Sequence, residues 1–265
     1  MTQRLAKFLE GCYAQYNVRA CRDSDPVSFV HEHDDPLERE VVGLIAACLA
    51  YGKLASILAS VGRALERLEN RPRSFLLRRS EAEIRLACEG FRHRFTGGEA
   101  LARLLCGVRR VLKRRGSLRA CFLAHDGGSS STVLPAAGAF VAEVAGSPDG
   151  IRHLLPSPAG GSACKRLCLY LRWMVRCDEV DPGGWDCVGP ARLLVPLDTH
   201  MARVCHLLGF TRRESSPDMR AVREVTEAFR HIRPDDPARY DFSLMHRSVE
   251  GGPDFPAILR RAAGA

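Results

Sequence analysis

The sequence lacks any apolar segment long enough to cross a membrane. A spanning helix needs roughly 20 consecutive apolar residues, and no such run occurs although 46% of the 265 residues are hydrophobic. The segment Met1–Glu10 is polar and amphipathic, so it does not have the pattern of a secretory signal peptide. We therefore expect a cytoplasmic protein with no membrane partner.

Strand-like alternation of apolar and polar residues is almost absent, and so are internal repeats and low-complexity segments. Apolar residues instead recur at helical spacing along most of the chain, which predicts an all-α fold. The predicted helices are Leu37–Tyr51, Leu54–Leu68, Glu99–Lys113, Leu118–His125, Val133–Ala145, Asp149–Leu155, Ala163–Arg176, Thr199–Leu208, Pro217–Arg230 and Pro237–Met245.

Disulfide bonds are not expected. The 11 cysteines are odd in number and spread along the chain. Many of them lie within apolar helical patterns, which is typical of buried thiols in a reducing compartment. The cysteines with this pattern are Cys48, Cys88, Cys106, Cys168 and Cys205. Cys164, Cys168, Cys177 and Cys187 match no common zinc spacing, and we expect neither a metal nor another cofactor.

Positive charge is in excess. The formal net charge is +8, from 39 Lys and Arg against 31 Asp and Glu, and Arg is much the more frequent cation. Arginine suits phosphate contacts, so this balance is compatible with a nucleic-acid partner. An Arg-rich surface encoded by a GC-rich genome explains the charge equally well.

A Gly-rich turn precedes a strongly predicted helix. Gly160, Gly161 and Ser162 form the end of this turn, where backbone N–H groups can hold a phosphate and Ser162 is the expected helix cap. Lys165 follows in the first helical turn, where the helix dipole and the neighbouring Arg166 disfavour a charged amine. The neutral amine is the nucleophilic form. The alternative for Lys165 is an ordinary solvated lysine.

Asp198 begins a second predicted helix, Thr199–Leu208. The simplest role for Asp198 is to cap this helix. Capping is compatible with catalysis, because it fixes the carboxylate and keeps it ionised.

Two further groups of residues could bind a ligand. His31, Glu32, His33, Asp34 and Asp35 could hold a metal, although adjacent residues of a helix point apart. The only tryptophans, Trp173 and Trp185, follow Lys165 in the sequence and could stack on a base, although Trp173 also fits the core.

The segment LLVPLDTHMARVCHLLGF, residues 193–210, resembles the VDTH signature of helix-hairpin-helix DNA glycosylases. In that superfamily a lysine follows the hairpin and an aspartate follows after a further helix, and Lys165 and Asp198 occupy those places. Their separation is longer than in endonuclease III-like members and resembles the archaeal 8-oxoguanine glycosylases.

The whole chain also resembles an uncharacterised bacterial family, domain of unknown function twenty-four-hundred. The matching pieces are Asp25-Pro26, Leu49-Ala50-Tyr51-Gly52, Gly116-Ser117-Leu118, SACKRLCLYLRWMVR, PLDTHMARV and DPARYDF. This resemblance covers nearly the full length but implies no known activity.

The glycosylase resemblance implies two helical lobes with a central cleft. We expect residues 30–180 to form one lobe with the hairpin and Lys165, and residues 1–29 and 181–265 to form the other with Asp198. The hairpin is degenerate, because Leu155-Pro156-Ser157-Pro158-Ala159-Gly160-Gly161 replaces the usual Leu-Pro-Gly-hydrophobic-Gly. An iron–sulfur cluster is excluded, because no cysteine follows Cys205.

The resemblance implies a monomeric, nucleoid-associated base-excision glycosylase with lyase activity on a damaged, oxidised purine in double-stranded DNA. Lys165 would form a Schiff base with the sugar, assisted by Asp198. The phosphate contacts would come from Gly160, Gly161, Ser162, Arg166 and Arg203, and Trp173 and Trp185 would lie near the base. The alternatives are a non-catalytic, structure-specific DNA-binding protein with the same fold, or a helical scaffold or metal-binding protein built on His31–Asp35.

Overall fold

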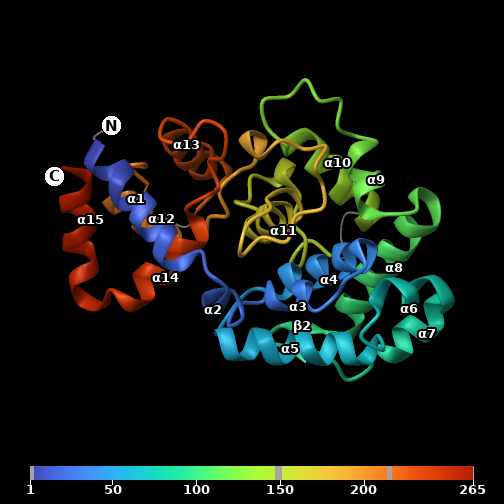
Figure 1. Cartoon of the computed structure of the whole chain (residues 1–265). Coiled ribbons are helices and arrows are strands. Elements are labelled where there is room, and N and C mark those ends of the chain that lie inside the picture. Colours follow the sequence, from blue (N-terminus) through green and yellow to red (C-terminus); the bar gives the residue numbers. More distant parts are fainter. Residues whose placement is uncertain (1–2, 147–150, 214–216, 265) are drawn as a thin grey trace. The chain divides into compact units, whose positions relative to one another are not determined.

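The structure is a computed structural model that describes residues 3–146, 151–213 and 217–264 of the chain. It is mostly helical, as the sequence predicts, with one short β-hairpin (Figure 1). The chain divides into two compact units: an inserted unit, Ser24–Gly160, and a split unit made of Met1–Asp23 and Gly161–Ala265. Among the described residues, no helix has the length and apolarity that a membrane crossing requires.

The inserted unit holds eight α-helices and the hairpin among its described residues. Its elements are α3 (Ser28–His31), α4 (Pro36–Leu49), α5 (Leu54–Arg67), α6 (Pro72–Arg78), α7 (Glu81–Ala87), β1 (Arg92–His93), β2 (Thr96–Gly97), α8 (Gly98–Arg115), α9 (Leu118–Leu123), α10 (Leu134–Ala145) and the 3-10 helix η1 (Pro158–Gly160). The buried helix α4 contacts α3, α5, α6 and α9, while α8 contacts α6, α7, α9 and α10.

Two buried glutamates of α4 connect it to the starts of neighbouring helices. Glu38 accepts hydrogen bonds from the backbone N–H groups of Arg73 and Ser74 at the start of α6, at 2.8 and 2.9 Å. Glu40 accepts one from Leu118 at the start of α9, at 2.7 Å. The N–H groups of a first helical turn have no partner within the helix, and the helix dipole favours an anion there. These carboxylates are therefore satisfied although they are buried.

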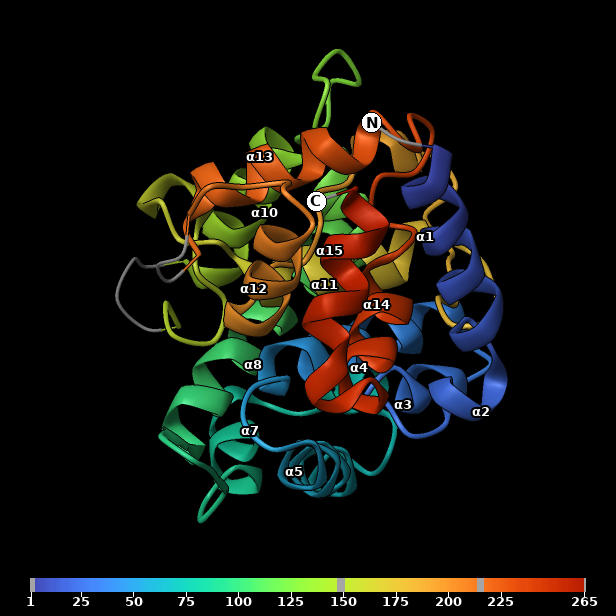
Figure 2. The same ribbon diagram turned by 90° about the vertical axis from the view of Figure 1, so that its left-hand side faces the viewer.

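The split unit contains the remaining elements. They are α1 (Gln3–Tyr16), α2 (Arg19–Arg22), α11 (Lys165–Val175), the 3-10 helix η2 (Pro190–Arg192), α12 (Thr199–Leu207), α13 (Met219–Arg230), α14 (Asp241–Glu250), the 3-10 helix η3 (Gly252–Asp254) and α15 (Phe255–Ala263). Helices α1, α14 and α15 lie side by side in Figure 1 and in the turned view of Figure 2. Helix α12 packs against α14 and α15.

Most of the predicted helices are present, with ends that differ by a few residues. The prediction of Pro237–Met245 was displaced, because this helix begins at Asp241. The predicted helix Asp149–Leu155 lies partly outside the described residues, and residues 151–155 form turns.

The boundary between the units also differs from the one expected at residue 180. The second segment of the split unit already begins at Gly161. Lys165 and Asp198 therefore belong to the same unit and not to two different lobes. The reason is that α11 and the loop after it are held together. Backbone N–H groups of Gly183 and Trp185 in that loop donate to the carbonyls of Trp173 and Met174, at 3.0 and 2.8 Å.

Candidate functional site

Lys165 is the first residue of α11. The residue before it, Cys164, occupies the N-cap position with a left-handed backbone, φ 49°, and provides no side-chain cap. The expected cap, Ser162, lies two residues earlier, and its hydroxyl accepts a hydrogen bond from the N–H of Cys164 at 3.3 Å. The prediction of Ser162 as the helix cap was therefore wrong by two residues. The left-handed residue at Cys164 redirects the chain before the helix begins.

Asp198 is the N-cap of α12, as the sequence predicts. Its Oδ1 accepts a hydrogen bond from the backbone N–H of Met201 at 2.9 Å. This bond satisfies one of the free N–H groups at the helix start and fixes the side-chain rotamer. The second oxygen, Oδ2, remains available for a different contact.

That second contact is with Lys165. The Nζ of Lys165 lies 3.6 Å from Oδ2 of Asp198, and the two side chains are 31% and 34% exposed. The pair is therefore accessible to a ligand but partly shielded from water. A carboxylate at this distance can neutralise the ammonium group or receive its proton after a small movement. The arrangement suits an amine nucleophile with a neighbouring base.

A third charged residue near the pair, Asp241, was not identified from the sequence. Asp241 begins α14 and is almost completely buried, at 6% exposed. Its carboxylate forms an ion pair with Arg172, which lies two turns along α11 from Lys165 and therefore on the same face. Both Lys165 and Asp198 are close enough to Asp241 to affect its titration.

Burial raises the pKa of Asp241 from 3.8 to about 6, and the negative charge of Asp198 acts in the same direction. The cations Arg172 and Lys165 oppose this rise in the pKa. The Lys165 amine therefore has two carboxyl groups in its surroundings, and one of them changes its charge just below neutral pH.

The Arg172–Asp241 pair is one end of a buried ionic network. Arg172 also donates to Asp181 at 3.1 Å, and Asp181 in turn pairs with Arg176. Arg176 contacts Asp236 at 3.0 Å. All these groups belong to the split unit, and Arg172, Arg176 and Asp181 are at most 4% exposed.

The network also connects the two chain segments of the split unit. Asp178 accepts from Arg176 at 2.7 Å and from the hydroxyl of Tyr13 at 2.9 Å. Helix α1 is thereby attached to the loop that follows α11. Since a buried charge without a partner is strongly unfavourable, the network fixes how these segments pack.

The turn before Lys165 is exposed. Gly160 ends η1, and Gly161 follows with φ +75°, a conformation that favours glycine. The carbonyl of Gly161 accepts a hydrogen bond from the N–H of Met219 at 2.9 Å, and Ser162 forms a single β-bridge with Asp218. The turn is thus attached to the start of α13 within the split unit.

The two arginines expected to contact phosphates differ in exposure. Arg203 is exposed on α12, whereas Arg166 is half-buried in the first turn of α11. Both therefore lie on the helices that carry the Lys165–Asp198 pair. Their role as phosphate ligands stays a prediction.

The tryptophans do not form an open base pocket. Trp173 and Trp185 are 0% and 1% exposed, and the Trp185 ring packs edge-to-face on Tyr170 with centroids 5.6 Å apart. The expectation that they stack on a base is not compatible with this burial. Trp173 belongs to the core because α11 is buried on most of its circumference, and Trp185, in the loop after α11, packs against that helix.

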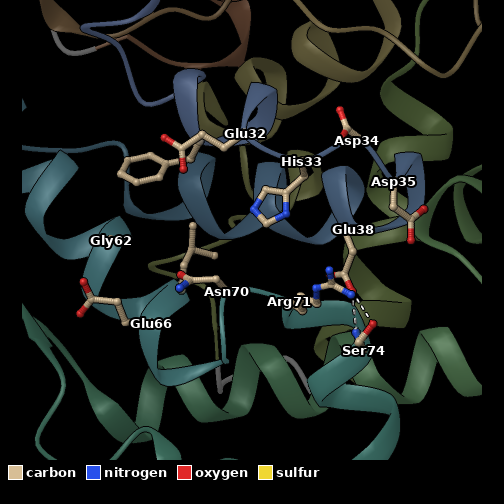
Figure 3. A pocket seen from close by; sticks show the side chains of 12 residues that line it. Glu32, His33, Asp34, Asp35, Glu38, Gly62, Glu66, Asn70, Arg71 and Ser74 are labelled. Carbon is tan, nitrogen blue, oxygen red and sulfur yellow. Dashed lines mark hydrogen bonds between the residues drawn. The ribbon is translucent and has the colours of Figure 1, made fainter.

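Four residues of the His31–Asp35 cluster line a pocket of the inserted unit with a volume of about 730 Å³: Glu32, His33, Asp34 and Asp35. Figure 3 shows the ring of His33 extending from the loop before α4 toward Asn70 and Arg71. Asp35 instead caps α4 by accepting from the N–H of Leu37 at 2.9 Å. The acidic side chains are distributed around the pocket and do not converge on one point.

Within the ranges 3–146, 151–213 and 217–264, one group of side chains has ligand atoms close enough for a metal ion, and it lies elsewhere. Cys121, His125 and Glu143 have such atoms within 4.8 Å of one another. Arg115 already pairs with Glu143 at 2.9 Å and is the main cause that lowers the pKa of this carboxyl to about 2. Burial raises the pKa of the Cys121 thiol to about 12. We therefore interpret this group as an ion pair beside a protonated thiol.

None of the described cysteines forms a disulfide bond, and the five that lie in apolar helical patterns are all buried.

Comparison with known proteins gives a family but no activity. The sequence profile of a family described as Protein of unknown function (DUF2400) matches residues 25–250. The chain belongs to this family. No curated protein and no solved structure matches it.

The DUF2400 match includes the complete candidate site. It covers Lys165, Asp198 and the whole of α11, α12 and α14. Three of the sequence pieces that resemble the family therefore meet in one place: the segment with Lys165 and Arg172, the segment with Asp198, and the segment with Asp241.

Proposed function

We propose that this DUF2400 protein is a DNA N-glycosylase with AP-lyase activity that removes a damaged, oxidised purine from double-stranded DNA. The observation that carries the proposal is the Lys165–Asp198 pair, whose Nζ and Oδ2 are 3.6 Å apart at the starts of two helices. The proposal includes a helix-hairpin-helix glycosylase-like fold, on the resemblance of the segment around Asp198.

In this mechanism Asp198 first accepts a proton from the Lys165 ammonium group. The neutral amine then attacks C1′ of the deoxyribose, and the bond between C1′ and the purine N9 breaks. The base leaves with the electron pair of that bond and takes up a proton from water. Once Asp198 has passed the lysine proton on to water, its ionised carboxylate also stabilises the positive charge that develops on the sugar.

The covalent intermediate loses a proton from its nitrogen and opens the sugar ring to a Schiff base. Removal of a C2′ proton then breaks the C3′–oxygen bond, which cleaves the DNA strand. Water finally releases the sugar from Lys165. General acid–base assistance of this kind contributes typically 10²–10⁴-fold to a rate.

Borohydride trapping tests the proposal, because it reduces the Schiff base to a stable amine between protein and DNA. The substrates are duplexes with oxidised, deaminated or alkylated bases and a duplex with an abasic site. We expect a covalent adduct with the wild-type protein and with Lys113→Gln, a control at an exposed lysine of the inserted unit. Lys165→Gln should form no adduct but should still bind DNA.

Asp198→Asn tests the charge of Asp198 separately from its capping role, because asparagine also caps helices well. We expect a fold stability close to that of the wild type and a trapping rate lower by about 10²–10⁴-fold. The lyase proposal fails if the wild-type protein forms no adduct on any duplex and leaves the abasic site uncleaved. DNA binding with steep salt dependence and no base release would instead indicate a non-catalytic DNA-binding protein.

A further inference from the structure

The β-hairpin of the inserted unit exposes an aromatic ring. His93 pairs with Thr96, so Arg94 and Phe95 form a two-residue turn, and Arg94 has a left-handed backbone with φ 52°. Phe95 is 66% exposed, which makes it one of the four large hydrophobic side chains that are exposed among the described residues. A single exposed hydrophobic side chain is common on a protein surface, so the surroundings of Phe95 decide whether it has a function.

Phe95 belongs to a stack of rings on the surface. Its ring lies on Tyr51 with centroids 4.8 Å apart and an interplanar angle of 26°. His153 lies beside it at 5.9 Å, tilted by 59°. We refer to Tyr51, Phe95 and His153 as the aromatic platform. Tyr51 covers one face of the Phe95 ring, and the large exposure of Phe95 means that much of the ring still faces solvent.

Hydrogen bonds hold the platform rigidly. The Tyr51 hydroxyl donates to the carbonyl of His93 at 3.0 Å and lies 2.5 Å from the hydroxyl of Thr96. The Nε2 of His153 lies 3.2 Å from the same threonine hydroxyl. The ring of His93 bridges the carbonyl of Tyr51 and the hydroxyl of Ser60, at 3.0 and 2.9 Å. The position of Phe95 is thus fixed before any partner arrives, which reduces the entropic cost of binding.

The segments that build the platform carry only positive charge. Residues 50–63, 91–98 and 151–160 contain no aspartate or glutamate. They contain the cations Lys53, Arg63, Arg92, Arg94 and Arg152. All five are exposed residues. A flat exposed ring on segments whose charged residues are all cations fits a ligand with a π face and negative charges near it, which is the chemistry of a nucleotide in a strand.

We propose that the aromatic platform binds an unpaired nucleobase of DNA by stacking on Phe95, with the surrounding cations on the adjacent phosphates. This inference rests on the DNA partner of the proposed function but not on the chemistry of Lys165. Stacking on an aromatic ring tolerates any base, because every base has a π face. The platform therefore selects an unpaired base and not a particular sequence.

The probe is a duplex that contains one unpaired 2-aminopurine, compared with the same duplex fully paired. The fluorescence of 2-aminopurine falls when it stacks, so the measurement reports both Kd and stacking. We expect the wild-type protein to bind the unpaired probe more tightly and to quench it. Phe95→Trp should keep both properties. Phe95→Ala should raise the Kd about 5- to 150-fold, the range that base–aromatic stacking shows on alanine substitution, and should abolish quenching.

Two controls keep the result interpretable. Leu86→Ala removes another exposed hydrophobic side chain, 64% exposed on α7, and should bind as the wild type does. Phe95→Leu keeps an apolar contact with Tyr51 but has no π face, so it should also lose quenching. The platform is refuted if Phe95→Ala and Phe95→Leu quench and bind like the wild type, or if the wild-type protein does not prefer the unpaired probe.

The result of this test can be distinguished from the result of the borohydride test of the Lys165 mechanism. A protein that quenches the probe but forms no borohydride adduct has the platform and lacks the proposed catalysis. A protein that forms the adduct but does not quench the probe has the catalysis and lacks the platform.

Discussion

Replacement of Arg172 by methionine should destabilise the protein strongly and in a pH-dependent way. Methionine replaces the apolar stem of the arginine side chain but removes the charge that faces Asp181 and Asp241. Removing one partner of a buried ion pair costs about 3–5 kcal/mol. Asp181 keeps its pair with Arg176, so we expect the lower end, about 3 kcal/mol at pH 8.

The pH dependence follows from Asp241. At pH 5 this carboxyl is mostly protonated in the wild type, because burial raises its pKa to about 6. Without Arg172 its pKa should rise further, and each additional unit costs about 1.4 kcal/mol where the group must ionise. The loss of stability should therefore be larger at pH 8 than at pH 5.

Urea denaturation of four proteins measures this effect: the wild type, Arg172→Met, Asp241→Asn and the double variant. We expect the two substitutions to be coupled by roughly 1–3 kcal/mol at pH 8, so that Arg172→Met costs less when Asp241 is already neutral. Arg213→Met is the matched control, because its exposed pair with Glu224 should contribute at most about 1 kcal/mol. The same cost for Arg172→Met in both backgrounds, and at both pH values, would refute the reasoning.

Three further substitutions have defined outcomes. Because the folded state binds the Asp241 proton more tightly than the unfolded state, the stability from this group is complete below pH 3.8 and is lost as the pH rises to about 6. Asp241→Asn should abolish this loss of about 3 kcal/mol, measured by denaturation at a series of pH values. Parallel pH profiles of the stability of the wild type and the variant would contradict the prediction. Gly52→Ala should cost about 1–3 kcal/mol in thermal unfolding, because φ is +101° and the new Cβ would lie 2.8 Å from the Arg94 side chain; an unchanged Tm would count against the strain. Glu40→Gln should cost about 1–2 kcal/mol in chemical denaturation, because it weakens a charged hydrogen bond to the N–H of Leu118; a wild-type midpoint would show that the charge contributes nothing.

Helices with a clear apolar period and a recognisable start could be predicted from the sequence. Helix α5 was predicted over Leu54–Leu68 and spans Leu54–Arg67, and α9 was predicted from Leu118 and begins there, after Ser117 as its N-cap. Asp198 was predicted as the cap of α12 and occupies that position. In these cases the determining interactions lie within a few residues of one another, so local patterns are sufficient.

The β-hairpin could not be predicted, because each strand has only two residues and no alternation can develop over that length. Its formation depends on a left-handed arginine in the turn and on contacts with Tyr51, which is distant in the sequence. The exposed Phe95 was missed for the same reason. A phenylalanine between polar residues gives no periodic signal.

The ionic network shows a different limit. Arg172 lies in an apolar helix and would be assigned to its exposed side, yet it pairs with a carboxylate 69 residues away. No local pattern specifies such a pair. The only signal in the sequence was that Asp236 and Asp241 belong to DPARYDF, one of the pieces that resemble the DUF2400 family.

The order in which the two units can form follows from the split between residues 23 and 161. A ribosome releases the whole inserted unit as one continuous segment, which can fold while the rest of the chain is still being made. Helix α1 emerges before the inserted unit, but its partner α14 is made much later, because the Tyr16 hydroxyl donates to Glu250 at 2.6 Å across a separation of 234 residues. During synthesis the apolar face of α1 therefore remains uncovered until α14 has left the ribosome, and this is the interval in which a nascent-chain chaperone would have a surface to bind.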